Sequence, residues 1–358
     1  MPPILVVDGH TDPAYNTLVD GRDYLRSAYV IRAEEAGGPV EAGNGICMLG
    51  VPEWLAGRVA VVVTTLTAIP RSDAKPGELG YPNAEGAHQA AVAQLHIYRD
   101  WAARHPQVTI IEDRRGLDAV LASWEPTAPS EGRQVGLVLL IENADVIREP
   151  AELDWWLGRG VRMIGPAWSS NRYTGDTDGG GPLTPLGRDL VARMARRGVP
   201  LDVSHMSDRA IVEACDLHDG VILASHANPR RHVDLRRNLS DDTIRRIAAQ
   251  DGIVGIMPLG WALDATWSTH RDRSRIPVDR VVDAIEAVCE MTGGARHVGI
   301  GSDFDGGQGA ECAPDGIDTT ADLGRIADRL AARGYADEQV VAIMSGNWLR
   351  VLSASFPG

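Results

Sequence analysis

Eight short runs of apolar, mostly β-branched residues recur along the chain, and polar or amphipathic stretches separate them. Runs without polar interruptions are typical of strands that are buried on both faces, as in parallel sheets. The strands predicted in this way cover residues 4–10, 59–66, 135–142, 161–168, 200–206, 221–227, 252–259 and 297–304. Eight strands that alternate with helices favour an α/β fold, a closed (β/α)8 barrel of the TIM type, over an open doubly wound sheet.

The stretches between these runs carry apolar residues at helical spacing. Helices are predicted at residues 85–105, 184–198, 240–252 and 278–294. Ser240 is the predicted N-cap of the third helix, and Gly252 marks its end. Residues 338–352 predict a closing helix. Residues 68–84 and 169–183 are rich in turn residues and follow predicted strands, so we expect them to form loops over the barrel mouth.

The length of 358 residues fits either one large barrel or two medium domains. The chain shows no internal repeat and no Pro/Gly/Ser linker long enough to separate two domains. We therefore predict one domain that spans residues 1–358. No GxGxxG sequence follows any predicted strand, which weakens the alternative of a dinucleotide-binding fold.

Charge and composition narrow the choice of partners. The net charge of −14 argues against a nucleic-acid or anionic-membrane partner. Four cysteines without a CxxC spacing argue against a cysteine zinc site and a disulfide framework. No run of 18 apolar residues predicts a membrane span, and the first residues do not resemble a signal peptide. The expected localisation is cytoplasmic.

Polar residues interrupt the apolar runs at one end only, the carboxyl end of each strand. In a parallel barrel these ends meet at one mouth, where active sites lie. The sequence therefore predicts that six or seven polar side chains converge there. They are His10, Asp12, Glu142, His205, His226, Asp303 and Asp305.

Each of these residues also has a simpler interpretation. His10 and Asp12 alone could be a turn pair after a strand, and Glu142 could be paired with an arginine. A single histidine such as His205 or His226 is more often a hydrogen-bonded core residue than a ligand. Two histidines at equivalent places on consecutive strands favour metal binding.

Three histidines and two or three carboxylates form a mixed nitrogen and oxygen ligand set, which suits Zn²⁺. Five ligands indicate two ions with one bridging carboxylate, an arrangement that can activate water and polarise a scissile carbonyl. Asp303 is the candidate that would carry a proton from the water to the leaving amine. The chain lacks a Walker lysine and a GxSxG sequence, and the remaining histidines lie away from strand ends.

The sequence resembles a known family, the renal or membrane dipeptidases, which are zinc peptidases of the amidohydrolase-like barrel group. The similarity extends over nearly the whole chain and includes DGHTD (8–12), LLIENAD (139–145), residues 183–207, residues 224–242, VGIGSDFDG (298–306) and GNWLRVL (346–352). The resemblance implies that His10 and Asp12 hold a first zinc, Glu142 bridges to a second, and His205 and His226 hold the second.

The resemblance assigns Asp303 as the acid/base residue and Arg237 as the group that binds the substrate carboxylate. Two departures from the family pattern are visible. The family usually reads EGGH where this chain reads ENAD, so Asn143 and Asp145 replace a glycine and a histidine. Trp168 stands where eukaryotic members have a histidine that contacts the substrate carbonyl, so we count Trp168 as a substrate-binding residue.

The leading hypothesis is a binuclear zinc dipeptidase that cleaves dipeptides with a free C-terminal carboxylate. The resemblance further implies tolerance of a D-residue at that position and a possible homodimer. One alternative is a metal-dependent amidohydrolase that acts on an N-acyl amino acid, a lactam or another small amide. A third hypothesis is a non-catalytic metal-binding barrel. The intact set of candidate ligands argues against it.

Overall fold

The computed structural model describes residues 4–74 and 80–356, and its centre is a sheet of parallel strands. The strands are β1 (Val6–Thr11), β2 (Val59–Thr67), β3 (Val108–Ile110), β4 (Val135–Glu142), β5 (Val161–Gly165), β6 (Leu201–Asp202), β7 (Ile222–Leu223), β8 (Val254–Ile256) and β9 (Val298–Ile300). Their order is β7-β6-β5-β4-β2-β1-β9-β8. An isolated parallel bridge between Ala224 and Val254 joins the two ends of this order, so the sheet curls into a barrel.

The fold prediction is confirmed, because eight of these strands coincide with the eight apolar runs. The sequence missed β3, a three-residue strand that pairs with the first half of β4 through Val108 and Val135. Its few residues give no period that a pattern could reveal. Several predicted strands are longer than the observed ones, because their last residues leave the ladder and carry the polar side chains.

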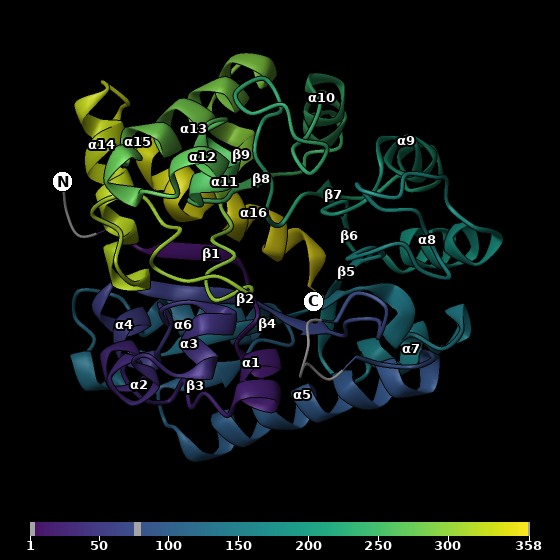
Figure 1. The fold of residues 1–358 in the computed structure, drawn as a ribbon, viewed down its shortest axis with the longest axis horizontal. Helices are drawn as coiled ribbons and strands as arrows, with labels where there is room; N and C mark the ends of the chain where they lie inside the picture. The colour runs from purple at the N-terminus through teal and green to yellow at the C-terminus, as the bar shows by residue number, and fades with distance from the viewer. Residues whose placement is uncertain (1–3, 75–79, 357–358) are drawn as a thin grey trace.

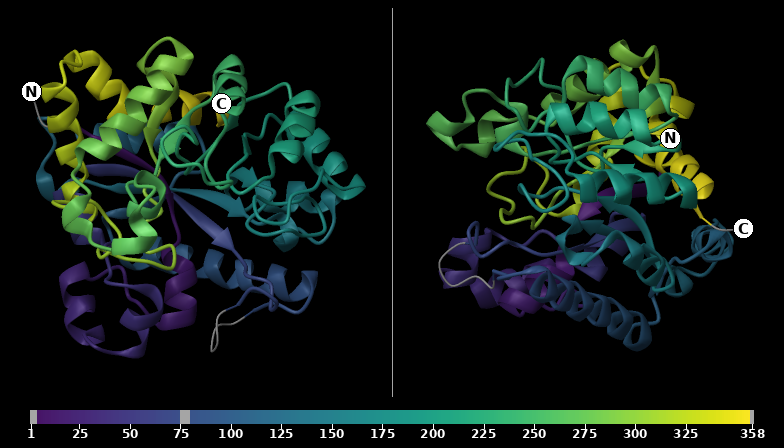
Figure 2. Two further views of the ribbon diagram at one scale, coloured as in Figure 1. Left: turned by 45° about the horizontal axis from the view of Figure 1, so that its top comes forward. Right: turned by 90° about the vertical axis from the view of Figure 1, so that its right-hand side faces the viewer.

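Helices surround the barrel, as both views of Figure 2 show. In Figure 1 the long helix α5 lies along one side, and α13, α14 and α15 gather on the opposite side. The helices are α1 (Pro13–Asp20), α2 (Ala28–Glu35), α3 (Pro39–Asn44), α4 (Val51–Ala56), α5 (Ala84–Arg104), α6 (Arg114–Ala122), α7 (Leu153–Leu157), α8 (Pro185–Arg197), α9 (Asp208–Leu217), α10 (Asp241–Ala249), α11 (Gly260–Leu263), α12 (Trp267–His270), α13 (Asp279–Thr292), α14 (Gly324–Ala332), α15 (Asp337–Val341) and α16 (Asn347–Ser355). Within the described part of the chain, no helix has the length and apolar character needed to cross a membrane.

The predicted helix limits hold to within a few residues where capping groups mark them. The Ser240 side chain accepts a hydrogen bond from the backbone N–H of Thr243 and caps α10. This helix ends at Ala249, earlier than the predicted Gly252. Helix α13 ends at Thr292, and its C-cap Gly293 has a φ of 80°, in the left-handed region that glycine tolerates.

The predicted closing helix divides into α15, a π-helical turn at Ala342–Gly346 and α16. Its Trp348 is fully buried under the barrel and donates a hydrogen bond from Nε1 to the carbonyl of Ile300 at 2.8 Å. A Cβ atom at Gly9 would lie 2.1 Å from the Trp348 ring, and one at Gly299 would lie 2.8 Å from it. These two glycines are therefore required for the indole to close that end of the barrel.

The two predicted mouth loops lie where expected as far as they are described. Ile69 and Asp73 of the first loop line the cleft, and residues 75–79 of this loop lie outside the described residues. Ser169 and Asp176 of the second loop line the same cleft. The strands thus fix a rigid ring, and the loops that follow them build the walls of the site.

Candidate metal centre and active site

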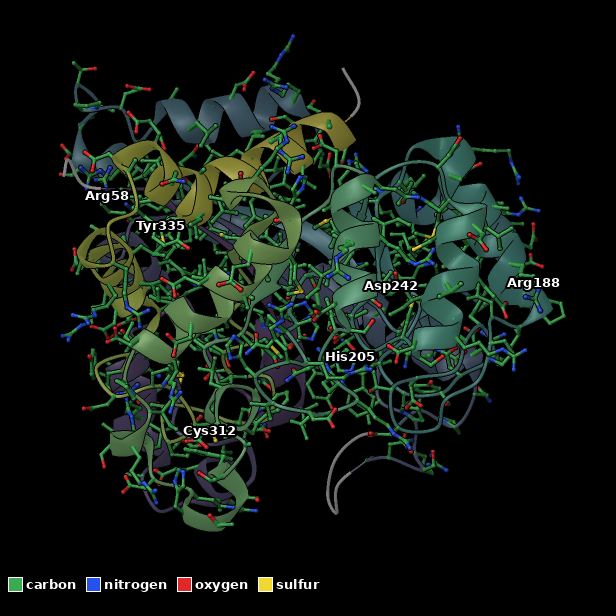
Figure 3. The ribbon with its side chains drawn as sticks, turned by 90° about the horizontal axis from the view of Figure 1, so that it is seen from above. Arg58, Arg188, His205, Asp242, Cys312 and Tyr335 are labelled. Carbon is green, nitrogen blue, oxygen red and sulfur yellow. The ribbon has the colours of Figure 1, made fainter. Side chains whose placement is uncertain are left out.

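A cleft of about 710 Å³ opens at the carboxyl ends of the barrel strands. Most residues predicted for the site line this cleft, namely Asp12, Glu142, Trp168, His205, Arg237, Asp303 and Asp305. His10 and His226 are buried next to them, with exposed fractions of 0% and 1%. Figure 3, which draws the described side chains, shows His205 near the middle of the molecule. The structure therefore brings together all the residues that the strand ends predicted.

The Glu142 carboxylate lies at the centre of three imidazole rings. Its Oε1 atom is 3.5 Å from Nε2 of His10, 3.3 Å from Nε2 of His205 and 3.6 Å from Nε2 of His226. Asp12 approaches from the other side, with its Oδ2 atom 3.7 Å from Nε2 of His10. Glu142 can lie there because it is the last residue of β4 and points out of the ladder into the mouth.

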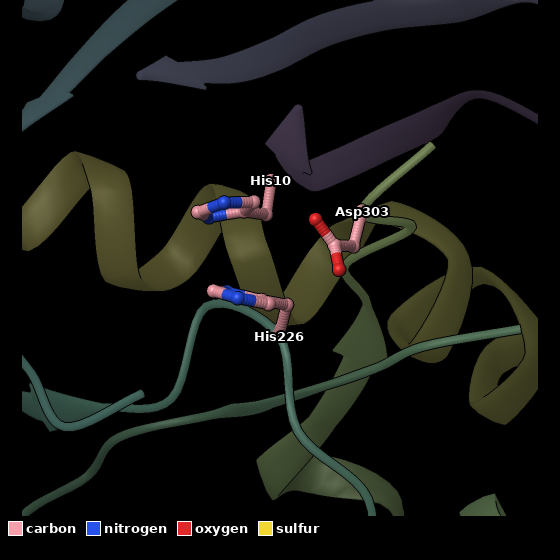
Figure 4. A group of neighbouring side chains, drawn as sticks. All are labelled: His10, His226 and Asp303. Atoms are coloured by element: carbon pink, nitrogen blue, oxygen red, sulfur yellow. The ribbon is translucent and has the colours of Figure 1, made fainter. Parts of the chain in front are cut away.

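These side chains fit a metal pair. Three groups of side chains could each hold a metal ion, because the potential ligand atoms within each group all lie within 4.8 Å of one another. The groups are His10/Asp12/Glu142, Glu142/His205/His226 and His10/His226/Asp303. Within the part of the chain that the structure describes, Nε2 of His10 is buried without a hydrogen-bond partner, which is costly unless a cation occupies that side. In Figure 4 the His10 and His226 rings lie one above the other, and the Asp303 carboxylate points toward them. The ring centroids of His10 and His226 are 3.6 Å apart.

The buried carboxylates of the cluster also favour the binding of added positive charge. Burial, together with repulsion from Asp12 and Glu142, holds the pKa of Asp303 well above its usual range. Burial raises the pKa of Glu142 to about 8, although the charge of His10 opposes this shift. Burial alone would lower the pKa of His10, but the charges of Glu142 and Asp12 raise it to about 10. A site with this many buried carboxylates favours cations.

Arg237 reaches the cluster from the chain segment after β7. Its Nη2 atom donates a hydrogen bond to the carbonyl of His226 at 2.9 Å and lies 3.2 Å from Nε2 of His205. Its Nη1 atom is buried and has no hydrogen-bond partner among the described residues. A buried guanidinium donor without a partner at a cleft wall is ready to bind an anionic group of a ligand.

Trp168 lines the cleft beside the histidines, with its ring centroid 6.4 Å from that of His205. The other departure from the family pattern, at Asn143 and Asp145, lies further out. Asn143 has a φ of 79°, a left-handed conformation that asparagine tolerates better than most residues, so it can replace a glycine. Asp145 accepts hydrogen bonds from Tyr81 Oη at 2.8 Å and Arg172 Nε at 3.1 Å. Both residues tie mouth loops together, and neither belongs to the candidate ligand groups.

Sequence reasoning missed two polar residues behind the histidines, Asp202 and Ser225, and it misjudged Asp305. Asp305 lines the cleft, but its carboxylate turns away and accepts a hydrogen bond from the backbone N–H of Met48 at 2.8 Å. The carboxylate also lies 3.6 Å from the buried guanidinium of Arg22. Asp202 follows the apolar start of its strand as Asp303 does, so a search for every polar residue near a strand end would have found it.

The fold and site define a metal-dependent hydrolase barrel, and comparison with known proteins identifies its family. The model of the membrane dipeptidase family, peptidase family M19, matches residues 2–355. The chain therefore belongs to this family, which confirms the predicted resemblance and places it among metallo-dipeptidase-like hydrolases.

Individual relatives agree with this assignment. The chain is 32% identical over 232 residues to a protein in the pqqA 5′ region of Klebsiella pneumoniae, covering 62% of this chain and 83% of that protein. It is 32% identical over 201 residues to dipeptidase tcpJ of Claviceps purpurea, covering 54% of this chain. That match spans 44% of the length of tcpJ.

Solved structures show the same fold. A metallo peptidase from Rhodobacter sphaeroides, liganded with a phosphinate mimic of the dipeptide L-Ala-D-Ala, has a TM-score of 0.80 at 23% identity. The similarity covers 99% of this chain and 100% of that chain. The probable dipeptidase PvdM from Pseudomonas aeruginosa has a TM-score of 0.80 at 22% identity, covering 98% of this chain and 95% of that chain.

Proposed function

We propose that this protein is a binuclear zinc dipeptidase that acts on dipeptides with a free C-terminal carboxylate. One observation carries the proposal: a single carboxylate oxygen of Glu142 lies within 3.3–3.6 Å of Nε2 of three histidines. In this assignment His10 and Asp12 would hold one ion, His205 and His226 would hold the other, and Glu142 would contribute to both. Imidazole and carboxylate donors without thiolates suit Zn²⁺.

The chain's own residues have distinct tasks around the metals. Bound zinc ions would polarise the scissile carbonyl and lower the pKa of a water molecule. Asp303 takes a proton from the attacking water and delivers it to the leaving amine, a task that suits a carboxyl whose pKa burial raises. The free Nη1 donor of Arg237 binds the C-terminal carboxylate of the substrate.

Trp168 is proposed as the second substrate contact. No protein group accepts a hydrogen bond from its indole N–H among the described residues, and the ring lines the cleft next to His205. The N–H can therefore donate to the carbonyl oxygen of the substrate as negative charge develops there. Tolerance of a C-terminal D-residue belongs to the same proposal, supported by the L-Ala-D-Ala mimic bound to the Rhodobacter sphaeroides protein.

Metal analysis and a substrate panel test this proposal together. We expect two zinc ions per chain and turnover of L-Ala-L-Ala and L-Ala-D-Ala, with much slower turnover of the C-terminal amides. Asp303→Asn should keep both ions and lose most turnover, whereas Asp216→Asn on the exposed face of α9 should change neither. Loss of zinc from Asp303→Asn would show that Asp303 is a ligand and overturn its assigned role.

A second candidate function follows from Trp168 and the ENAD sequence. A pocket that lacks the usual histidine could accept an N-acyl amino acid or a lactam, which still presents a carboxylate to Arg237. The same panel distinguishes the two, because hydrolysis of N-acetyl amino acids without any dipeptide turnover would favour the second function. Zinc-replete protein that is inert on every amide would favour a non-catalytic barrel.

A further inference from the structure

One hydroxyl group contacts two of the candidate metal ligands from behind. Ser225 follows β7, is fully buried, and places its Oγ atom 3.0 Å from Nδ1 of His10 and 2.8 Å from Nδ1 of His226. The same Oγ atom lies 2.5 Å from Oδ2 of Asp202. The two histidines belong to different strand ends, so Ser225 connects the two halves of the candidate centre.

Both carboxylate oxygens of Asp202 accept hydrogen bonds. Its Oδ1 atom accepts hydrogen bonds from the backbone N–H groups of Ser204 at 3.0 Å and Ser225 at 2.9 Å. The Ser225 hydroxyl donates its single hydrogen to the other carboxylate oxygen, Oδ2 of Asp202.

This arrangement determines where the protons of both imidazoles lie. With its hydrogen committed to Asp202, the Ser225 oxygen can only accept hydrogen bonds, so Nδ1 of both His10 and His226 must carry hydrogen. In a neutral ring Nε2 then keeps its lone pair. In both histidines Nε2 is the atom that faces Oε1 of Glu142, where a metal would bind.

We propose that Asp202 and Ser225 are positioning residues that fix the tautomers of His10 and His226 together. The inference rests on the proposed metal ligands and adds the part that prepares two of them for binding. Ser225 itself has little freedom to move. A Cβ atom at Gly255 would lie 2.0 Å from the Ser225 carbonyl oxygen, and one at Gly301 would lie 1.8 Å from it, so the neighbouring strands pack directly against its backbone.

The test uses zinc affinity rather than activity. Ser225→Ala removes the acceptor of both Nδ1–H groups, and we expect zinc affinity for both ions to fall about 10- to 100-fold in chelator competition. Ser204→Ala is the matched control. Its Oγ atom lies 3.3 Å from Ser225 Oγ and accepts a hydrogen bond from the backbone N–H of His226 at 3.3 Å, but among the described residues it has no hydrogen bond to an imidazole ring. We expect its zinc affinity to stay within about threefold of the wild type on the same scale.

Asp202→Asn provides a second variant in case Ser225→Ala does not fold. Its amide can donate to Ser225, whose hydroxyl then turns to one histidine, so we expect the two zinc affinities to separate. Nitrogen-15 NMR of the zinc-loaded wild type should show hydrogen on Nδ1 of both rings. Unchanged affinities in both variants, or hydrogen on Nε2, would overturn the inference.

The proposed function can fail separately. The position of the hydrogen on the His226 ring can also be read by nitrogen-15 NMR in zinc-free protein. An Nδ1–H tautomer there, together with no dipeptide turnover, would leave the positioning role intact and remove only the dipeptidase assignment.

Discussion

Gly306 offers a way to move the Asp303 carboxylate without removing it. A Cβ atom built on Gly306 would lie 2.2 Å from Oδ1 of Asp303 and 3.0 Å from its Cγ atom. The backbone of Gly306 does not have a positive φ, so alanine brings no conformational strain of its own. The main conflict of Gly306→Ala is with a side-chain end that can rotate away. A further contact of 3.0 Å with the backbone oxygen of Asp303 requires only a small shift, so the protein should stay folded.

The displacement sets the expected size of the effect. A normal contact requires the carboxylate to retreat by roughly 1 Å, and a misplacement of this size costs about 10²-fold in rate. We expect kcat of Gly306→Ala to fall by about 10²-fold, equivalent to about 2.7 kcal/mol of activation free energy. KM and zinc content should change little, because the three atoms nearest to a Cβ atom at Gly306 all belong to Asp303.

Steady-state kinetics on L-Ala-L-Ala, zinc analysis and urea unfolding measure these three quantities. Gly324→Ala is the matched control, since a Cβ atom at Gly324 at the start of α14 would meet no atom within 4 Å. A Gly306→Ala enzyme that binds two zinc ions and keeps kcat within threefold of Gly324→Ala would refute the assignment of Asp303 as the proton carrier.

Three further substitutions test other parts of the site. Arg237→Met should raise KM for dipeptides by about 10- to 100-fold, because a charge-assisted hydrogen bond is lost, and should leave KM for C-terminal amides unchanged; equal effects on both substrates would place Arg237 outside the site. Trp168→Phe keeps a ring and removes the N–H donor, so kcat should fall by about tenfold or more at constant zinc content, and an unchanged kcat would remove that donor from the mechanism. Arg22→Met leaves the buried Asp305 carboxylate without its cation and should lower the free energy of unfolding by about 3–5 kcal/mol in urea titrations, whereas a loss below about 1 kcal/mol would show that the pair is not coupled.

The residues at the strand ends could be predicted because the barrel converts one-dimensional spacing into proximity. An apolar run marks a buried strand, and its first polar residue must lie at the mouth, whichever strand carries it. This reasoning places Glu142 and His226 in one cluster although 84 residues separate them in sequence. It needs no knowledge of the loops between them.

The contacts behind the cluster could not be predicted in this way. Ser225 and Asp202 touch because the β6 and β7 strands pair in one register, with Asp202 opposite Leu223. A shift of one residue would turn the Asp202 side chain to the other face of the sheet. The sequence pattern shows that two strands are neighbours but does not fix their register, so the Ser225 hydrogen bonds became visible only in the structure.

Backbone conformation was the other feature that the sequence concealed, and it explains how the site is aimed. Among the described non-glycine residues, His205, Asp303, Asp305 and Asn143 are four of the seven with positive φ, and all four lie at the barrel mouth. Such conformations cost about 1–3 kcal/mol each, so surrounding contacts must hold them. The Asp303 N–H donates to the carbonyl of His10 at 3.0 Å, which ties the proposed proton carrier to a candidate ligand. A chain that leaves a strand in ordinary extended geometry would carry these side chains outward along the strand axis. The left-handed residues change the direction of the backbone directly after the strand, so the side chains stay over the mouth. The packing of the rigid barrel below offsets the free-energy cost of these conformations.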